Sequence, residues 1–241
     1  MHFKSVVVSL CIAVPALGSA PVQAASATSS FDWSHASFST FATDGGAISY
    51  TWDAHGMAAA TANGTTNYDP TYWDAEDGVY SAINTNGNAT ATALMNTNTW
   101  TTQASVSAGA FPAQANAVSQ NWGALSVSGT GFLLIKVPYT LTVDRTGGGD
   151  VSAFGQIYSS AAGTNSSLNA AVFLSNWDPV SSRSGVLNFA LYSEGSYKGW
   201  LNVYTSAAAN VAAVPEPESY SLMLCGLALM GVMARRRKAR S

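Results

Sequence analysis

The chain has 241 residues, of which 47% are hydrophobic and 10% are charged, and its formal net charge is −3. Five of its ten Lys and Arg residues lie in the last seven positions, so residues 25–213 carry eleven acidic and four basic side chains, a net charge of −7. This balance excludes nucleic acid and anionic lipid as partners of that segment, because both bind clustered cations. Cys11 and Cys225 lie outside it, which excludes disulfides, thiol nucleophiles and cysteine metal sites there.

Residues 1–24 have the three parts of a secretory signal peptide. Lys4 supplies the positive charge, residues 6–16 are apolar, and residues 22–24 (Val-Gln-Ala) resemble the small-residue site at which signal peptidase cuts. We therefore expect cleavage after Ala24 and export of the following residues across the inner membrane.

Residues 25–213 are expected to form one exported domain of about 190 residues, long enough to bury a core. Ser, Thr, Asn, Ala and Gly dominate its composition, and aromatic residues are interspersed. This composition is typical of exported β-proteins and not of amphipathic helices. Short strand-like stretches separated by turn signals predict an all-β fold, a single-domain antiparallel β-sandwich that is jelly-roll-like.

The clearest strand spans residues 131–144. Its odd-numbered positions from Leu133 to Val143 are apolar or aromatic, a period of two that only a strand presents to a core. Pro138 has no N–H to donate to a neighbouring strand, so we expect this strand to lie at a sheet edge or to be bent by a bulge. The Gly-rich sequence that follows predicts a turn, after which residues 151–159 return antiparallel and pair with it.

Turn signals separate the remaining strands. Asp44-Gly-Gly, Asn63-Gly and Asn86-Gly suit tight turns. Residues 104–117 are compatible with strand or loop. Further strands are expected at residues 48–52, 89–102, 119–127, 170–174, 186–192 and 200–205.

An acidic stretch lies between the strands expected at residues 48–52 and 89–102. Asp69, Asp74, Glu76 and Asp77 are candidate ligands for Ca²⁺, which prefers six to eight oxygen atoms. The alternative is a solvated acidic turn. Asp74 and Glu76, next to the aromatic Trp73, are also the best-placed carboxylate pair for a glycoside hydrolase. Because most such pairs are simply solvated, we expect no enzyme activity and assign no catalytic residue and no cofactor other than this calcium candidate.

His35 and His55 are the histidines of the domain. Together with Asp53 they could bind a metal ion, and either could act in acid–base chemistry. A histidine on a turn or on the surface is the commoner case, and we adopt that interpretation.

All seven tryptophans lie in the domain. Exposed Trp and Tyr side chains stack on pyranose rings, while Asn and Asp side chains hydrogen-bond to sugar hydroxyls. Trp73 and Trp177, on predicted turns, are the best-placed candidates for a glycan-binding site. The alternative is that the tryptophans pack in the core or pair across strands.

The C-terminal segment, residues 214–241, has three consecutive parts. The first is a Val-Pro-Glu-Pro motif, which is extended because proline restricts itself and the residue before it. Residues 220–234 are uncharged and predict a single membrane helix of roughly 22 Å, short of the ~30 Å hydrocarbon core. The basic tail, residues 235–241, compensates by snorkelling to the headgroups and orients the C-terminus towards the cytoplasm. The motif residues are Val214, Pro215, Glu216 and Pro217, and the cations are Arg235, Arg236, Arg237, Lys238 and Arg240.

This ordered combination closely resembles the PEP-CTERM sorting signal of Gram-negative bacteria. The resemblance rests on the Pro-Glu-Pro motif, on Gly226 and Gly231 within the apolar run, and on the Arg-rich ending. It implies processing by an exosortase, a membrane-embedded cysteine transpeptidase-like protease, in organisms that make exopolysaccharide. The alternative is a tail anchor that is never cut.

These features predict a protein that meets signal peptidase and exosortase, is anchored transiently in the inner membrane and then reaches the outer surface or extracellular matrix. The first hypothesis for its role is a structural or adhesive component associated with exopolysaccharide in a biofilm. The alternatives are a secreted lectin-like module that binds glycans, with or without calcium, and a glycan-acting hydrolase.

Overall fold

The computed structural model describes residues 24–69, 79–107, 112–144, 146, 149–163 and 167–213, together with residues 223, 226, 227, 230 and 231. Between residues 24 and 213, the regular elements in these ranges are antiparallel strands and one 3₁₀ turn, η1 (Trp33–His35), which confirms the all-β class. The strands are β1 (Ala24–Asp32), β2 (Ser37–Ala42), β3 (Ser49–Ala62), β4 (Thr65–Tyr68), β5 (Tyr80–Asn86), β6 (Ala89–Met95), β7 (Thr99–Ser107), β8 (Ala113–Ser128), β9 (Gly131–Asp144), β10 (Asp150–Ala161), β11 (Ser167–Ser175), β12 (Ser182–Ser193) and β13 (Ser196–Val211).

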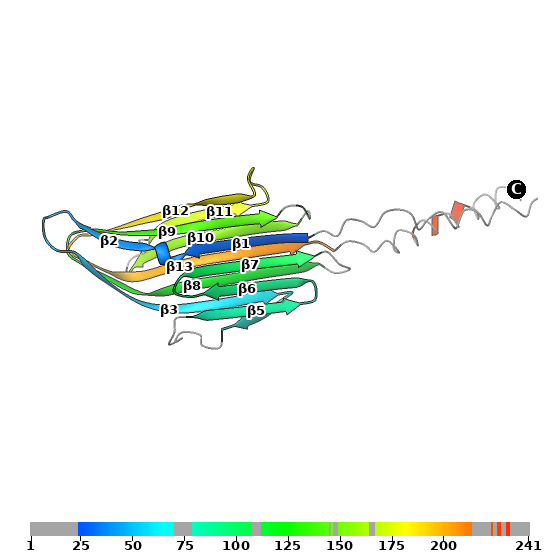
Figure 1. Ribbon diagram of the computed structural model, residues 1–241, viewed down its shortest axis with the longest axis horizontal. Coiled ribbons are helices and arrows are strands. Elements are labelled where there is room, and N and C mark those ends of the chain that lie inside the picture. The colour runs from blue at the N-terminus through cyan, green and yellow to red at the C-terminus, as the bar shows by residue number, and fades with distance from the viewer. Residues whose placement is uncertain are drawn as a thin grey trace, which may run out of the picture.

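The strands form two sheets that lie face to face as a sandwich (Figure 1). Sheet A has seven strands in the order β12-β9-β1-β7-β6-β5, with β2 also paired to β9, and sheet B has six in the order β11-β10-β13-β8-β3-β4. Strands β1 and β7 pack against β13, and β6 packs against β8 and β3. With more strands than an eight-stranded jelly roll, the sandwich is wide enough to leave two broad outer faces.

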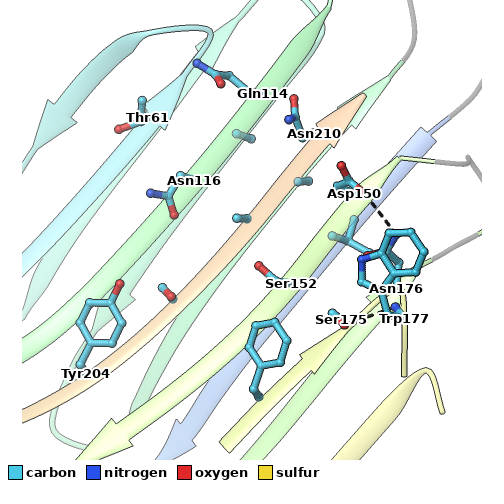
Figure 2. A pocket seen from close by; sticks show the side chains of 16 residues that line it. Thr61, Gln114, Asn116, Asp150, Ser152, Ser175, Asn176, Trp177, Tyr204 and Asn210 are labelled. Atoms are coloured by element: carbon cyan, nitrogen blue, oxygen red, sulfur yellow. Dashed lines mark hydrogen bonds between the residues drawn. The ribbon is translucent and has the colours of Figure 1, made fainter. Parts of the chain in front are cut away.

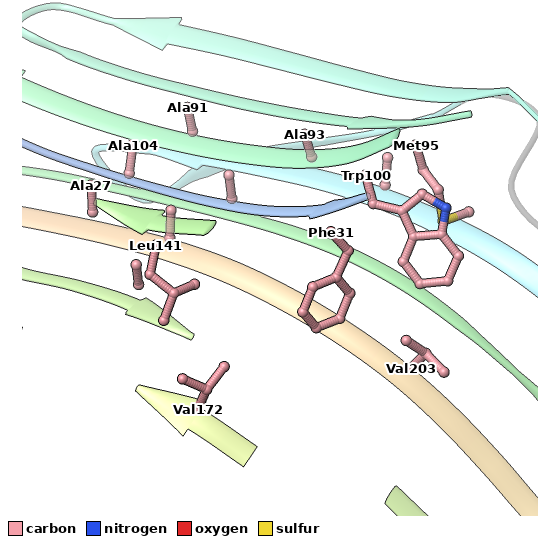
Figure 3. Close-up of a cluster of buried hydrophobic side chains, with 14 of the residues drawn as sticks. Ala27, Phe31, Ala91, Ala93, Met95, Trp100, Ala104, Leu141, Val172 and Val203 are labelled. Carbon is pink, nitrogen blue, oxygen red and sulfur yellow. The ribbon is translucent and has the colours of Figure 1, made fainter. Parts of the chain in front are cut away.

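The core between the sheets has two parts that differ in the size of their side chains (Figure 3). Around Phe31, Trp100 and Met95, which are at most 2% exposed, large side chains fill the space. The ring of Trp33 stacks on that of Trp100 with centroids 4.2 Å apart. Elsewhere, alanines from both sheets meet, so close packing requires the sheets to approach each other there. These alanines include Ala27, Ala58, Ala60, Ala91, Ala93, Ala104, Ala117 and Ala207.

Strand β9 confirms the predicted strand at residues 131–144, with Leu133, Ile135 and Leu141 completely buried. The edge position inferred from Pro138 is wrong, because β12 pairs with β9 on one side and β1 and β2 pair with it on the other. The ladder of paired residues beside β9 is interrupted on one side, between β1 and β2. In the described pairing, β1 ends opposite Tyr139 and β2 begins opposite Lys136, so the gap filled by η1 lies opposite Pro138.

The predicted hairpin between residues 131–144 and 151–159 is also wrong. Residues 151–159 form a strand, but β10 pairs with β11 and β13 in sheet B, whereas β9 belongs to sheet A. The apolar faces of β9 and β10 therefore meet across the core, where Leu141 and Ile157 are fully buried. Alternation and proximity in sequence do not distinguish a hairpin from a connection between two sheets, because both bury one face of each strand.

Residues 89–102, expected as one strand, are two. Strand β6 ends at Met95 and β7 begins at Thr99. Between them the Asn96 side-chain oxygen accepts hydrogen bonds from the backbone N–H groups of Asn98 and Thr99 at 2.8 and 2.7 Å. This Asx turn reverses the chain. Residues 104–117, left open as strand or loop, belong to β7 at one end and to β8 at the other.

The tight turns expected at Asn63-Gly and Asn86-Gly are confirmed, because each joins two paired strands. Asn63 and Gly64, between β3 and β4, have φ values of 44° and 80°. Both lie in the left-handed region, which Gly and Asn adopt more readily than other residues and which hairpin turns require. Gly87 between β5 and β6 has a positive φ as well. Asp44-Gly-Gly makes no hairpin, because it lies in the connection from β2 in sheet A to β3 in sheet B.

The predicted processing segments lie at the two ends of the chain, where the structure describes few residues. Residues 1–23 of the predicted signal peptide, the motif at residues 214–217, the basic tail and all but five residues of the expected helix at 220–234 lie outside the described residues. In the part of the chain that the structure describes, no helix is both long enough and apolar enough to traverse a bilayer. Strand β1 begins at Ala24, so cleavage after this residue would leave β1 in the exported domain almost whole.

Candidate functional site

The outer face of sheet B carries aromatic and amide side chains. On β13, the outward-facing Trp200, Asn202 and Tyr204 alternate with the buried Leu201 and Val203. The same alternation on β8, β10 and β11 brings further rings and amides to this face. The outward aromatic residues of these four strands are Trp122, Phe154, Tyr158, Phe173, Trp200 and Tyr204, and the outward amide residues are Gln114, Asn116, Gln120, Gln156, Asn169, Asn202 and Asn210.

A groove of about 750 Å³ lies on this face (Figure 2). It crosses β3, β8, β13, β10 and β11 and reaches the turn that follows β11. Amides, hydroxyls and aromatic rings line it together, and this mixture suits a ligand that has both polar groups and apolar faces. The polar and aromatic lining includes Gln114, Asn116, Ser152, Phe173, Ser175, Asn176, Trp177, Tyr204, Ser206 and Asn210.

Trp177 stands at the edge of the groove and is 85% exposed. The adjacent Asn176 donates a hydrogen bond from its amide nitrogen to the carboxylate of Asp150 at 3.3 Å, which ties the turn to the start of β10 (Figure 2). An indole with so little burial adds almost nothing to the core. Its ring is accessible to a ligand in the groove.

A second set of contacts shapes the same turn. The carboxylate of Asp178 accepts hydrogen bonds from the backbone N–H and the hydroxyl of Ser175 at 2.8 and 3.1 Å. Arg183 on β12 lies 3.5 Å from the other oxygen of Asp178 and donates to the backbone carbonyl of Phe173 at 2.8 Å. These contacts hold the turn against the end of β11 and so define where the indole of Trp177 lies.

The aromatic rings of sheet B continue beyond the groove as a diagonal line, here called the aromatic track. Phe173 and Phe154 are direct cross-strand partners with ring centroids 6.5 Å apart, and Phe154 lies 5.8 Å from Tyr204. Tyr204 pairs with a residue two positions from Trp122, which makes these two diagonal neighbours. Trp122 and Trp200 close the track with centroids 5.7 Å apart. Phe173 and Trp200 are 48% and 50% exposed, so both ends remain open.

Amide side chains flank the aromatic track. Tyr204 has Gln156 and Gln120 as its cross-strand partners, and Gln156 donates to the side chain of Asn169 at 2.9 Å. Among the described residues the side-chain oxygen of Asn202 is buried and has no hydrogen-bond partner. Because that oxygen has almost no accessible surface, a ligand on this face would bond instead to the outward-facing amides of Gln120 and Gln156.

The face bears little charge. Asp150 is the one charged residue among those that line the groove. At the other end of the aromatic track, Asp53 on β3 and Lys198 on β13 face outwards with opposite signs. The arrangement can therefore stack rings and exchange hydrogen bonds, with little electrostatic attraction for an ion.

The structure describes some of the site residues predicted from sequence and not others. Trp177 is among the residues that line the groove, and its role in glycan binding stays a prediction. Trp73, Asp74, Glu76 and Asp77 lie outside the described residues, so neither the calcium site nor the carboxylate pair is tested. Asp69 is described, is 6% exposed and accepts a hydrogen bond from the backbone N–H of Ser81.

The histidines lie on different elements, His35 in η1 and His55 in β3. His35 contacts Asp32 with its Nδ1 2.7 Å from a carboxylate oxygen, and hydrogen bonds from Ser34 and His35 lower the pKa of Asp32. His55 lies on sheet B, with its ring 6.4 Å from that of Trp122. Within the described ranges, no three His, Cys, Asp or Glu residues group closely enough to hold a metal, so His35, His55 and Asp53 form no such site there.

Sequence reasoning missed the aromatic track itself. The signal was present in residues 200–204, where the parity opposite the apolar Leu201 and Val203 carries Trp, Asn and Tyr. Sequence alone did not show that these rings align with Trp122 and Phe154, because that depends on the pairing of β13 with β8 and β10.

The fold and the groove define a two-sheet antiparallel sandwich with an open aromatic and amide face. The family model of the PEP-CTERM protein-sorting motif matches residues 213–238, directly after β13. The chain thus carries a PEP-CTERM sorting signal, and the signal marks an exported protein processed by an exosortase at the membrane. No curated protein and no solved structure matches the chain.

Proposed function

We propose that this protein is a non-enzymatic adhesive component of an exopolysaccharide matrix, delivered to the outer surface or matrix of a Gram-negative bacterium by its sorting signal. The outer face of sheet B is its polysaccharide-binding surface. The observation that carries this proposal is the groove, where Trp177, Phe173 and Tyr204 lie among amide side chains on an exported sandwich.

The chemistry of the groove favours sugar over other ligands. A pyranose ring has an apolar face that stacks on an aromatic ring, and its hydroxyls need donors and acceptors around its edge. Trp177 supplies an open ring face, and Gln114, Asn116 and Asn210 supply amides from two adjacent strands.

The groove favours binding over hydrolysis. Glycoside hydrolases place two carboxylates across the scissile bond, one of them protonated. Among the lining residues Asp150 is the single carboxylate, and Asn176 already hydrogen-bonds to it. A binding role needs no such pair, since stacking and hydrogen bonds alone supply the affinity.

The test uses the protein recovered from the surface or the culture medium of the producing cells, together with their purified exopolysaccharide. Intact mass should show a species that ends before Tyr220, because processing removes the apolar segment. In co-sedimentation the wild-type protein should bind the polysaccharide, and Trp177→Ala should weaken binding about tenfold through loss of one stacking contact.

Phe41→Ala is the matched control, since Phe41 is 61% exposed on a strand of sheet A. It should bind like the wild type. Absence of co-sedimentation, release of reducing sugar from the polysaccharide, or equal losses in the two variants would each overturn the binding role assigned to the groove. A recovered species that retains Arg235 to Ser241 would overturn delivery beyond the membrane.

A further inference from the structure

We infer that the ligand is an uncharged linear polysaccharide that lies obliquely across sheet B, from Trp177 along the aromatic track to Trp200, and that is bound along its length and not at its end. This inference rests on the proposed function and adds to it the charge, the direction and the minimum length of the ligand. Three observations carry it: the continuity of the rings, the polar groups beside them and the distribution of charge.

The aromatic track is continuous and open at both ends. Each ring from Phe173 to Trp200 is a direct or diagonal cross-strand neighbour of the next. Along β13 the distance from Asn210 at the groove to Trp200 is ten residues, about 33 Å in a strand. One or two sugar rings cannot span this length, whereas a polymer that enters at Trp177 can leave past Trp200.

The polar groups follow the same diagonal. Gln120 and Gln156 lie on either side of Tyr204, and the outward-facing Asn202 lies between Trp122 and Tyr158 as their direct cross-strand neighbour. Amides beside these rings fit a ligand that repeats hydroxyls at regular intervals. An apolar chain would offer these amides no hydrogen-bond partner.

The charges disfavour an acidic polymer. Uronate and sulfate groups form their strongest contacts with Arg and Lys side chains. Of the described residues, the groove lining contributes only the acidic Asp150, and Lys198 at the far end is offset by Asp53. Arg183, on the edge strand β12 of sheet A, is already engaged with Asp178 and Phe173. A carboxylated polysaccharide would therefore meet repulsion without compensation.

The experiment measures affinity by isothermal titration calorimetry with the exported protein. The probes are cello-oligosaccharides and malto-oligosaccharides of two to six sugars, with oligogalacturonates of equal length as acidic counterparts. We expect one neutral series to bind, affinity to rise at least tenfold from two to six sugars, and the result to change little between low and high salt.

Two variants at opposite ends of the aromatic track locate the ligand. Trp177→Ala and Trp200→Ala should each weaken binding of the longest neutral oligosaccharide about tenfold, and Phe41→Ala should leave it unchanged. Trp200→Ala should leave binding of the disaccharide unchanged if the disaccharide sits at Trp177. Circular dichroism of each variant shows whether the fold is retained.

The outcomes separate the two proposals. If short and long oligosaccharides bind equally, or if Trp200→Ala has no effect on the longest one, the extended track is overturned while binding at the groove stands. If the oligogalacturonates bind more tightly, the assignment of an uncharged ligand is overturned. If neither the oligosaccharides nor the cells' own exopolysaccharide binds, the proposed function itself fails.

Discussion

The two faces of strand β13 contain opposite kinds of side chain. Towards the core it presents Leu201, Val203 and Ala207, all completely buried, whereas towards solvent it presents Trp200 and Tyr204. An ordinary sandwich buries its largest rings, because they contribute most to the hydrophobic effect. Here aliphatic and small residues fill the inside of the strand and the rings lie outside, so the exposed rings are better explained by a ligand than by stability.

The outer face of sheet A carries fewer exposed rings, a short row in which Phe132 pairs directly with Phe41 and Tyr192. Thr28 on β1 pairs directly with Gln103 and Thr142, and Gln103 with Thr92, so one row across four strands is entirely polar. Ser30 is hydrogen-bonded to Thr101 in the next row at 3.4 Å. Both outer faces therefore expose rings, but the row of sheet A crosses three strands at one register, whereas the aromatic track of sheet B crosses four strands diagonally and borders the groove.

The largest expected effect is on the inner face of β13. Leu201→Ala should lower the free energy of unfolding by about 2–5 kcal/mol, because Leu201 is completely buried and its truncation leaves a cavity. Urea denaturation of the exported protein, followed by tryptophan fluorescence, measures the change. A loss below about 1 kcal/mol would mean that this face is not close-packed, and the contrast between the two faces would disappear.

A smaller effect is expected where the core is lined by alanine. Ala207→Leu adds three heavy atoms to a position with no exposed surface and should cost about 1–3 kcal/mol through overpacking. The matched control is Ala208→Leu, one residue further along β13, which faces the groove. This control should leave the denaturation midpoint nearly unchanged but reduce polysaccharide binding. Equal destabilisation by both variants would contradict the assignment of inner and outer faces.

The sequence predicted the features that depend on residues close together in the chain, and it did not predict those that depend on which strands pair. Alternation identified β9 and the β13 strand core, and Asn-Gly pairs identified hairpin turns, because these features depend on neighbours in sequence. The partner of β10, the interior position of Pro138 and the aromatic track depend on which strands pair, and several arrangements bury the same apolar faces. Trp177 was found because a turn exposes its side chain whatever the sheet order. Trp200 needed the register of β13 with β8.

The smallest expected effect on stability tests the comparison most directly. Trp200→Ala removes the largest side chain of β13, yet it should change the free energy of unfolding by less than about 1 kcal/mol, because half of that side chain is exposed and what it loses is a cross-strand contact with Trp122. Thermal denaturation of this variant beside Leu201→Ala measures both faces of one strand at adjacent positions. A stability loss as large as that of Leu201→Ala would make Trp200 part of the packing of the fold. A small loss, combined with weaker binding of a long oligosaccharide, would leave ligand binding as the reason for a tryptophan at this position.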